Sequence, residues 1–315
     1  MGSLVWIFVF GASLALLVKS ADWLLESGEK VGLKLGFSPF VVGVLIVGLG
    51  TSLPELISGL AAIMQGATEI VVANAVGSNI ANILLVIGVA AVVAKRLAVT
   101  KNLIDSELPL LAVSTVIFLV VVYNGEVTRG ESFFLISAYL IYLYYTIYGG
   151  EGDESRSRFL QLGKNVSVTW RDYTKLAGGV LGLFIGAKYL IDAVIQLSAI
   201  LNIAPDIISI TAIAVGTSLP EVMVSYKAAV EGKAEVAVGN ILGSNAFNAL
   251  MVVGIPTLFT TLKIETATLY IGVPTMALAT LLFIISGISK TIYRWEGLMF
   301  LLLYGLFTMK LFSLL

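Results

Sequence analysis

The chain has 315 residues, of which 58% are hydrophobic and only 12% are charged, and its mean hydropathy is +0.99. A soluble domain needs a polar surface and carries roughly 25% charged residues, so this composition excludes one. The formal net charge is −1 and no basic patch is present, so a nucleic-acid partner is not expected. Cysteine and histidine are absent, which excludes disulfides and limits any metal site to oxygen ligands.

Long apolar blocks separated by short polar islands predict membrane-spanning helices, because about 20 apolar residues cross a bilayer. The N-terminal block has no basic n-region, so it is predicted to be the first span rather than a signal peptide. We therefore expect an all-α membrane protein whose partner is the lipid bilayer. Ten transmembrane helices are predicted, near residues 3–25, 38–64, 69–94, 103–123, 131–149, 174–198, 204–230, 235–261, 267–288 and 296–314.

One charged stretch, residues 150–172, divides the ten segments into two groups of five. It predicts a linker between a first five-helix repeat over 1–149 and a second over 173–315. Thirteen Lys and Arg residues fall in the odd-numbered connections, whereas the even-numbered ones hold only Arg129 and Lys263. Because cytoplasmic loops carry the excess of basic residues, we expect a multi-pass plasma-membrane protein with both termini extracellular and the linker cytoplasmic.

An internal duplication is evident from the hexapeptide GTSLPE, which occurs at 50–55 and again at 216–221. The same offset of 166 aligns 15 identical positions out of 33 between 50–82 and 216–248. Each half has an odd number of spans, so the second half is expected to enter the membrane from the opposite side. Inverted repeats of this kind place their site near the midplane, where broken helices from both halves meet.

The hexapeptide itself predicts a helix break. Gly50 suits the left-handed end of a helical segment, and Thr51 and Ser52 are good N-cap residues. Pro54 suits the first turn of a restarted helix. Such a break would leave carbonyl groups near Gly48 unpaired, which is tolerated in a membrane only beside a cavity. The duplication places the equivalent residues Gly216 and Pro220 in the second half.

Two glutamates stand out among the 20 acidic residues, because only Glu55 and Glu221 lie deep inside apolar spans. A carboxylate at the bilayer centre costs roughly 3 kcal/mol, so it is rare without a function. The nearest basic residue in sequence, Lys227, follows Glu221 on a different helical face, so an ion pair between them is not expected. Two carboxylates match the charge of one divalent cation, and calcium takes about 6–8 oxygen ligands. The pair therefore predicts a calcium site.

A second duplicated element lies on the following span of each half. Its polar residues recur every four positions and therefore share one helical face. Neutral amide and hydroxyl oxygens suit monovalent ions beside the divalent site, although such stripes also serve as helix-packing contacts. The residues are Asn74, Ser78 and Asn82 in the first half and Asn240, Ser244 and Asn248 in the second.

With these motifs the chain resembles the calcium/cation antiporter superfamily, and within it the prokaryotic sodium/calcium exchanger branch. Its signatures are GTSLPE with GNxxGSNxxN, which here read GTSLPE at 50–55, NAVGSN at 74–79, GTSLPE at 216–221 and GNILGSN at 239–245. The resemblance covers nearly the whole chain. There are two departures, since position 73 is Ala where the family usually has Gly, and position 248 is Asn where some relatives have Asp.

The resemblance implies a set of site residues. For calcium, it implies that Glu55 and Glu221 act with Thr51 and Thr217. For sodium, it implies both glutamates, the four serines Ser52, Ser218, Ser78 and Ser244, the amides Asn82 and Asn248, and the carbonyls of Gly48 and Ala214. Supporting roles are expected for Asn74, Asn240, Pro54, Pro220, Gly50 and Gly216.

The resulting expectation is a secondary antiporter that exchanges sodium for calcium by alternating access, with spans 3–25 and 174–198 moving against the rest. A proton-coupled calcium exchanger is the alternative. An enzyme is not expected, because symmetric repeats supply identical roles whereas an acid and a base need different environments. A channel is disfavoured because a carboxylate pair at the midplane favours tight binding over rapid exit. No cofactor and no obligate protein partner are expected.

Overall fold

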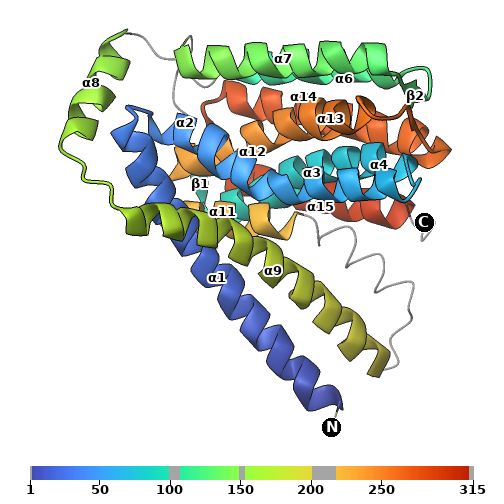
Figure 1. Cartoon of the computed structure of the whole chain (residues 1–315), viewed down its shortest axis with the longest axis horizontal. Helices are drawn as coiled ribbons and strands as arrows, with labels where there is room; N and C mark the ends of the chain where they lie inside the picture. Colours follow the sequence, from blue (N-terminus) through green and yellow to red (C-terminus); the bar gives the residue numbers. More distant parts are fainter. Residues whose placement is uncertain (1, 99–106, 149–152, 201–217, 312–315) are drawn as a thin grey trace.

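The computed structural model of the chain describes residues 2–98, 107–148, 153–200 and 218–311. It is an all-helical membrane-type fold in which long helices run side by side, with α1 and α9 crossing them obliquely (Figure 1). Within the described part, five helices are long and apolar enough to cross a membrane. They are Leu4–Lys34, Pro39–Met64, Glu69–Ala94, Ala234–Thr257 and Thr268–Ile288.

The first half of the chain begins with α1, a single helix that extends beyond the predicted end of the first span, to Lys34. The next two spans each contain a π-helical turn, labelled η, between two α-helical pieces. The elements are α1 (Gly2–Lys34), α2 (Pro39–Val42), η1 (Gly43–Gly48), α3 (Leu49–Met64), α4 (Glu69–Ile80), η2 (Ala81–Ile87), α5 (Gly88–Ala94), β1 (Arg96–Ala98), α6 (Leu108–Val122), β2 (Glu126–Val127) and α7 (Arg129–Tyr148).

The predicted linker contains a helix of its own, α8 (Asp153–Lys164), which sequence reasoning did not anticipate. The second half then repeats the pattern of the first, with α11 beginning just after the residues outside the description. Its elements are α9 (Trp170–Ile200), α11 (Leu219–Val230), α12 (Ala234–Phe247), η4 (Asn248–Val252), α13 (Val253–Thr257), β3 (Leu262–Lys263), η5 (Thr268–Gly272), α14 (Val273–Ile288), β4 (Thr291–Tyr293) and α15 (Arg294–Leu311).

The predicted helix break at Gly50 is wrong for the first repeat. Residues 39–64 form one continuous helical path through α2, η1 and α3, and Pro54 lies inside α3 rather than in a first turn. Gly48 has helical dihedral angles, and Gly50, Thr51 and Ser52 lie within the helix. The π-helical turn η1 takes up the irregularity instead, because i→i+5 bonding widens the helix without ending it. In the second repeat the residues before Ser218 lie outside the description, and within it Ser218 precedes α11, whose first turn contains Pro220 and Glu221.

The helices α1 and α9 pack against each other through small residues. A Cβ atom on Gly179 would come within 2.9 Å of the Leu24 backbone nitrogen, and one on Gly186 within 2.9 Å of Leu17. Ser20 faces Gly182 in the same interface. Small residues of this kind let membrane helices approach closely, so α1 and α9 form one tightly packed pair.

Two short antiparallel sheets join the halves. β1 pairs with β4, and β2 pairs with β3, so each sheet takes one strand from each half. β1 and β2 lie at opposite ends of the helix bundle (Figure 1). The connection after the third predicted span therefore meets the connection before the tenth, at the end opposite to the β2–β3 sheet.

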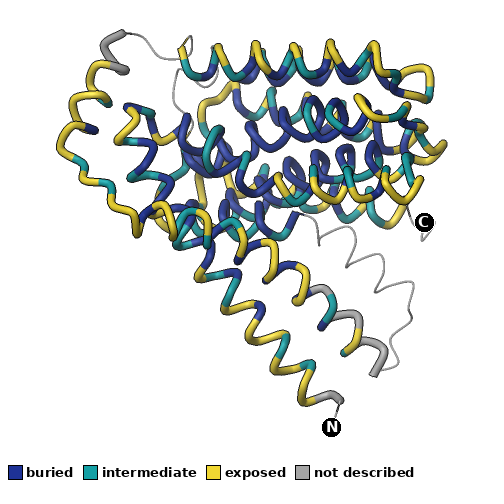
Figure 2. Tube along the Cα trace, in the orientation of Figure 1, coloured by how far each residue is buried: buried dark blue, intermediate teal, exposed yellow. Residues whose placement is uncertain are grey.

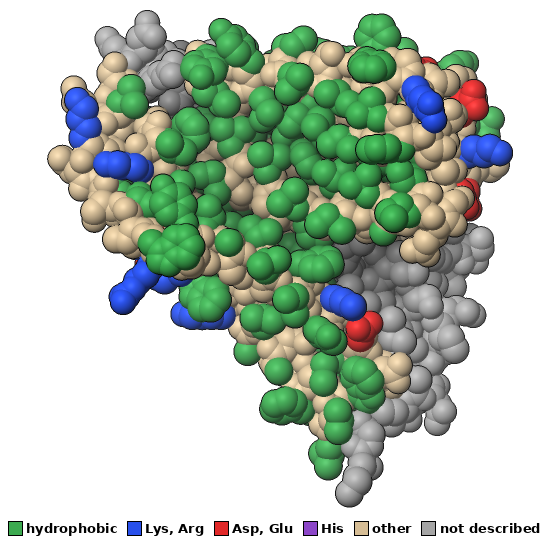
Figure 3. Space-filling view, in the orientation of Figure 1, with side chains coloured by type: hydrophobic (Ala, Val, Ile, Leu, Met, Phe, Trp, Pro, Cys, Tyr) green, Lys and Arg blue, Asp and Glu red, His purple; other side chains and the backbone are tan. Residues whose placement is uncertain are grey.

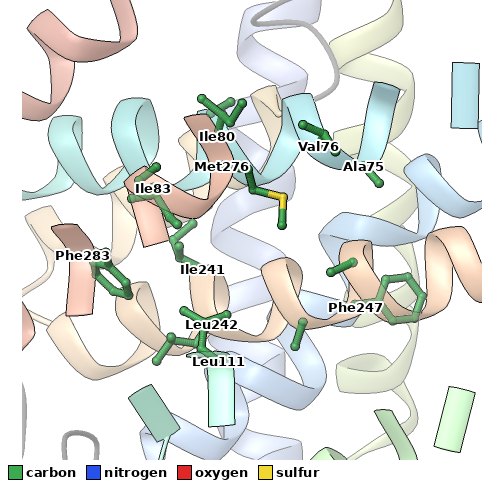
Figure 4. Packing of buried hydrophobic residues seen from close by; sticks show 14 of the residues in the cluster. Ala75, Val76, Ile80, Ile83, Leu111, Ile241, Leu242, Phe247, Met276 and Phe283 are labelled. Carbon is green, nitrogen blue, oxygen red and sulfur yellow. The ribbon is translucent and has the colours of Figure 1, made fainter. Parts of the chain in front are cut away.

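The core is formed by helices of both halves. α12 is buried from Val236 to its end at Phe247, as Figure 2 shows for the centre of the bundle. Around it pack side chains from several helices, among them Ile80 and Ile83 of the first half and Met276 and Phe283 of α14 (Figure 4). The face of the molecule seen in Figure 3 is largely apolar as well, with Lys and Arg mostly toward its margins. A core that is buried inside an apolar exterior is the arrangement expected of a protein surrounded by lipid.

Candidate functional site

The two predicted glutamates meet in the centre of the bundle. Glu55 of α3 is 2% exposed and Glu221 of α11 is fully buried. Ser52, one turn before Glu55, donates a hydrogen bond of 3.2 Å from its hydroxyl to Glu221 Oε1. The two carboxylates are also close enough to interact electrostatically. The duplicated acids are 166 residues apart in sequence but lie next to each other in one buried site.

This place lacks the partners that buried carboxylates normally have. Neither side-chain oxygen of Glu55 accepts a hydrogen bond, and Glu221 Oε2 is also unpaired among the described residues. Lys227 does not serve them, because its ammonium binds Asp22 at 2.7 Å. Two buried like charges without a counter-charge are strongly unfavourable, so the arrangement requires a bound cation or a proton.

A hydroxyl and amide network borders the carboxylates. Thr51 Oγ1 lies within hydrogen-bond distance of the Gly48 carbonyl at 3.3 Å, of Asn240 Oδ1 at 3.2 Å and of Ser244 Oγ at 3.4 Å. Ser244 Oγ lies 3.2 Å from the same Gly48 carbonyl. Thr51 and Ser244 come from different repeats and converge on the end of η1, so oxygens of both halves gather around one carbonyl.

Close backbone contact makes this convergence possible. A Cβ atom on Gly48 would lie 3.0 Å from the Asn240 carbonyl, and one on Gly243 would lie 2.5 Å from the Val44 carbonyl. Gly43 and Gly239 face each other in the same way one turn earlier. Glycine is needed at these positions because η1 and α12 touch through their backbones. Gly243 thus lets α12 approach η1 closely, whereas no described atom lies within 4 Å of the Cβ position on its duplicate, Gly77.

The predicted supporting asparagines are not equivalent. Asn240 is fully buried, donates to Ser225 Oγ at 2.9 Å and lies within reach of Thr51. Its duplicate Asn74 is only half buried and donates to Ser58 Oγ at 3.4 Å, and Ser58 in turn donates to the backbone carbonyl of Glu55 at 2.9 Å. The duplicated sequence alone predicts equal roles; among the described residues Asn240 contacts Thr51, whereas Thr217, the duplicate of Thr51, lies outside them. Ser225 belongs to the network but is not duplicated, so no sequence signal pointed to it.

A second amide cluster is formed where α4 meets η2 and α12 meets η4. Asn82 Nδ2 donates to Asn245 Oδ1 at 3.0 Å, and Asn79 Nδ2 donates to the Asn245 carbonyl at 3.1 Å. Asn82 and Asn248 are completely buried. The side-chain oxygens of Asn79, Asn82 and Asn248 accept no hydrogen bond in the described part of the chain. Asn79 and Asn245 are duplicates of each other whose roles sequence reasoning missed, although both lie in the GSN motif.

The helices that carry these amides contact the helices that carry the acids. η2, with Asn82, packs against α11, and η4, with Asn248, packs against α3. Ser78 and Ser218 are buried as well, and the Ser218 hydroxyl has no partner among described residues. Pro220 is buried and Pro54 partly buried beside the glutamates. Three predicted residues, Ala214, Gly216 and Thr217, lie outside the described residues.

The donor set is that of an alkali or alkaline-earth cation. The described residues contain no cluster of three or more acidic side chains, so any ion here is held by two carboxylates together with neutral hydroxyl, amide and carbonyl oxygens. Hard oxygens of this kind suit sodium, calcium and related ions. Since the whole cluster is buried in an apolar bundle, the ion would bind without its water shell.

Comparison with known proteins gives a consistent result. The family model described as "Sodium/calcium exchanger protein" matches residues 5–148 and 174–312. Sodium/calcium exchanger MaX1 of Methanosarcina acetivorans is 31% identical, covering 95% of this chain and 96% of that protein. Inner membrane protein YrbG of Escherichia coli is 32% identical, covering 80% of this chain and 79% of that protein.

Solved structures of the sodium-calcium exchanger NCX_Mj superpose with a TM-score of 0.81 at 28% identity, and cover 96% of this chain and 97% of that one. The two matched segments, with the buried acid of each, make the chain a multi-pass membrane cation exchanger rather than an enzyme. The chain belongs to the sodium/calcium exchanger family.

Proposed function

We propose that the protein exchanges sodium for calcium across the membrane, with Glu55 and Glu221 as the shared ligands. The observation that carries this proposal is the buried pair of glutamates, whose side-chain oxygens are largely unpaired while hydroxyls and amides of both repeats surround them. One divalent ion balances both charges. Sodium ions on overlapping ligands balance them equally, so binding of one kind displaces the other.

The proposed calcium and sodium ligands overlap at the two glutamates and differ elsewhere. Calcium is held by both glutamates with Thr51 and Thr217. Sodium uses the glutamates together with Ser52, Ser78, Ser218, Ser244, Asn82, Asn248 and the carbonyls of Gly48 and Ala214. The convergence of Thr51 and Ser244 on the Gly48 carbonyl supports this set for the first repeat. Sodium and strontium were soaked into NCX_Mj crystals, which agrees with a site that takes both valences.

The proposed architecture is ten transmembrane helices in two inverted repeats, 1–149 and 173–315, joined by the linker 150–172. The strand pairs support the inversion, since β1–β4 and β2–β3 join connections that the basic residues assign to the cytoplasmic and extracellular sides respectively. Both termini are then extracellular, at the plasma membrane. The tightly packed α1–α9 pair is proposed to move against the other helices during alternating access.

The test is calcium uptake into proteoliposomes that contain the purified full-length protein, with sodium, potassium and proton gradients imposed separately. An outward sodium gradient should drive calcium entry, and E55Q and E221Q should each abolish it. Calcium uptake driven by a proton gradient alone would support the proton-coupled alternative instead. Uptake that persists in E55Q would contradict the assignment of Glu55.

A further inference from the structure

Within the amide cluster, the hydrogen bonds are asymmetric although the sequence is duplicated. Asn82 and Asn248 are duplicates, as are Asn79 and Asn245. Asn245 Oδ1 accepts from Asn82 Nδ2 at 3.0 Å. The corresponding bond from Asn248 to Asn79 is not formed, because Asn248 Nδ2 and Asn79 Oδ1 are both unpaired in the part of the chain that is described. One amide of the pair is therefore held and its duplicate is not.

The held amide has a fixed direction. A carboxamide has its donor and acceptor at opposite corners, so binding of Asn82 Nδ2 to Asn245 leaves Asn82 Oδ1 as the free end. That oxygen is completely buried and accepts no hydrogen bond among the described residues. A flipped Asn82 would present a positively polarised NH₂ group to a cation, so the orientation decides whether Asn82 is a ligand at all.

Asn245 uses its side-chain oxygen to hold Asn82. Its Oδ1 accepts from Asn82 Nδ2, and its own Nδ2 can only donate. Its backbone is held in turn, since its carbonyl accepts from Asn79 Nδ2 at 3.1 Å and from the Asn248 backbone N–H. Asn79 also contacts Met276 Sδ at 3.7 Å, which ties the arrangement to α14.

We propose that Asn245 is a positioning residue that holds the Asn82 carboxamide with its oxygen toward the ion site, so that Asn82 is a fixed ligand and Asn248 an adjustable one. The inference rests on the proposed function and deepens it. A fixed neutral oxygen favours the ion that depends most on neutral ligands, which in the proposed set is sodium. Loss of the positioning bond therefore weakens sodium binding more than calcium binding.

The experiment measures the half-saturating concentrations of sodium and calcium for exchange in proteoliposomes containing the full-length protein. N245L removes the hydrogen-bond acceptor for Asn82 at similar side-chain volume. The half-saturating sodium concentration should rise about tenfold, as expected when the Asn82 oxygen loses its charge-assisted contact with the ion. The calcium value should change less than about threefold, since the carboxylates carry most of its binding. N245D keeps an acceptor for Asn82 Nδ2 and should restore the sodium value to within about threefold of wild type.

A double-mutant cycle separates positioning from general damage. N82L should resemble N245L, and the N82L/N245L double variant should be no worse than N82L alone, because the two residues act through one bond. T280V is the matched control, since Thr280 is buried, donates to the Met276 carbonyl within its own helix, and is not one of the proposed ligands. Its two half-saturating concentrations should equal those of wild type. If N245L is not recovered folded, N245A removes the same acceptor with less bulk and carries the same expectation.

The outcomes are distinct. A wild-type protein without sodium-driven calcium movement would contradict the proposed function, whatever Asn245 does. With a working wild type, unchanged sodium half-saturation in N245L or N245A would overturn the positioning role. Independent, multiplicative effects of N82L and N245L would overturn it too, as would an N245D variant that is as impaired as N245L.

Discussion

Asp22 of α1 and Lys227 of α11 form an ion pair of 2.7 Å between the carboxylate and the ammonium. A second pair, Glu29 with Lys233 at 2.9 Å, joins α1 to the segment that leads into α12. Within the α1–α9 pair, Glu26 binds Lys175 at 3.2 Å. Ion pairs thus both hold α1 to α9 and connect α1 to the helix that carries Glu221.

The first prediction compares the α1–α11 ion pair with the α1–α9 ion pair, in order to test whether α1 moves against α11. The chain contains no cysteine, so D22C/K227C places the only two thiols across that boundary. Joining them with a reversible bifunctional thiol reagent should stop calcium flux, and reduction should restore it. The physical reason is that, in the proposed alternating-access cycle, the joined residues belong to bodies that separate.

The control is E26C/K175C, whose thiols lie on α1 and α9 and should travel together. Joining them should leave calcium flux at least half that of the untreated variant. Full flux through the joined D22C/K227C protein would mean that α1 and α11 do not separate during transport. Removing the ion pairs alone should have a small effect on stability, about 1 kcal/mol or less, because their side chains are partly exposed.

The second prediction concerns stabilisation by the ion. Calcium at 100 times its dissociation constant should stabilise wild type by about 2.7 kcal/mol, seen as a rise in melting temperature in detergent. E55Q and E221Q should lose this rise. Without ions, both variants should melt higher than wild type, because the repulsion between two unpaired buried carboxylates is gone.

The matched control for that measurement is E107Q. Glu107 is 3% exposed and accepts from Thr146 at 3.4 Å, but it lies at the start of α6, away from the two glutamates of the site. E107Q should keep the calcium-dependent rise in full. A variant at Glu55 that is still stabilised by calcium would show that the ion binds elsewhere.

The third prediction tests the backbone contact between η1 and α12. G243A places a methyl group 2.5 Å from the Val44 carbonyl, and overpacking of this kind costs about 1–3 kcal/mol. We expect a lower melting temperature and reduced exchange, since Val44 and Gly48 belong to the same π-helical turn. G305A is the control, because no atom of the described residues lies within 4 Å of the corresponding position on α15. Equal melting temperatures for G243A and G305A would contradict the tight contact.

The fourth prediction concerns pH at the start of α9. Thr169 donates to Asp172 Oδ2 from its backbone N–H and from its hydroxyl, both at 2.8 Å, and Lys30 lies 3.3 Å from Asp172 Oδ1. These interactions, the Thr169 bonds first, lower the pKa of Asp172 to about 2. A lowered pKa stabilises the fold above the pKa of the unfolded chain, near 4, and the contribution disappears as pH falls toward 2.

D172N should therefore melt below wild type at pH 5 to 8, with a difference that is constant across that range and shrinks below about pH 4. Thermal melts in detergent at stepped pH measure this. T169V removes the hydroxyl donor and should add little in the D172N background, because both changes affect one cap. A melting difference that persists undiminished below the lowered pKa would contradict the capping role.

Much of the site was predictable because it is written in local sequence. GTSLPE and GSN recur at one offset, so the duplication, the two buried acids and their meeting at one site could be predicted from spacing alone. The membrane-spanning helices could be predicted as well, since the length of an apolar segment decides whether it can cross a bilayer. The shape of the helix around Gly50 was not, because Gly, Ser and Pro are compatible both with a break and with a π-helical turn, and packing against α12 selects between them.

The amino-acid sequence by itself determined the membrane class, the duplication and the paired acids Glu55 and Glu221, because each is a property of residue type and spacing along one chain. Only the tertiary structure decided the burial and the hydrogen-bond partners of each duplicated asparagine. Asn240 and Asn74 occupy duplicate positions but differ in burial, and among the described residues Asn245 holds Asn82 while Asn79 does not bind the Asn248 side chain. Such differences arise because a hydrogen bond between the two halves depends on how their helices pack. The sequence of a duplicated motif does not specify which residue of the other half it will contact.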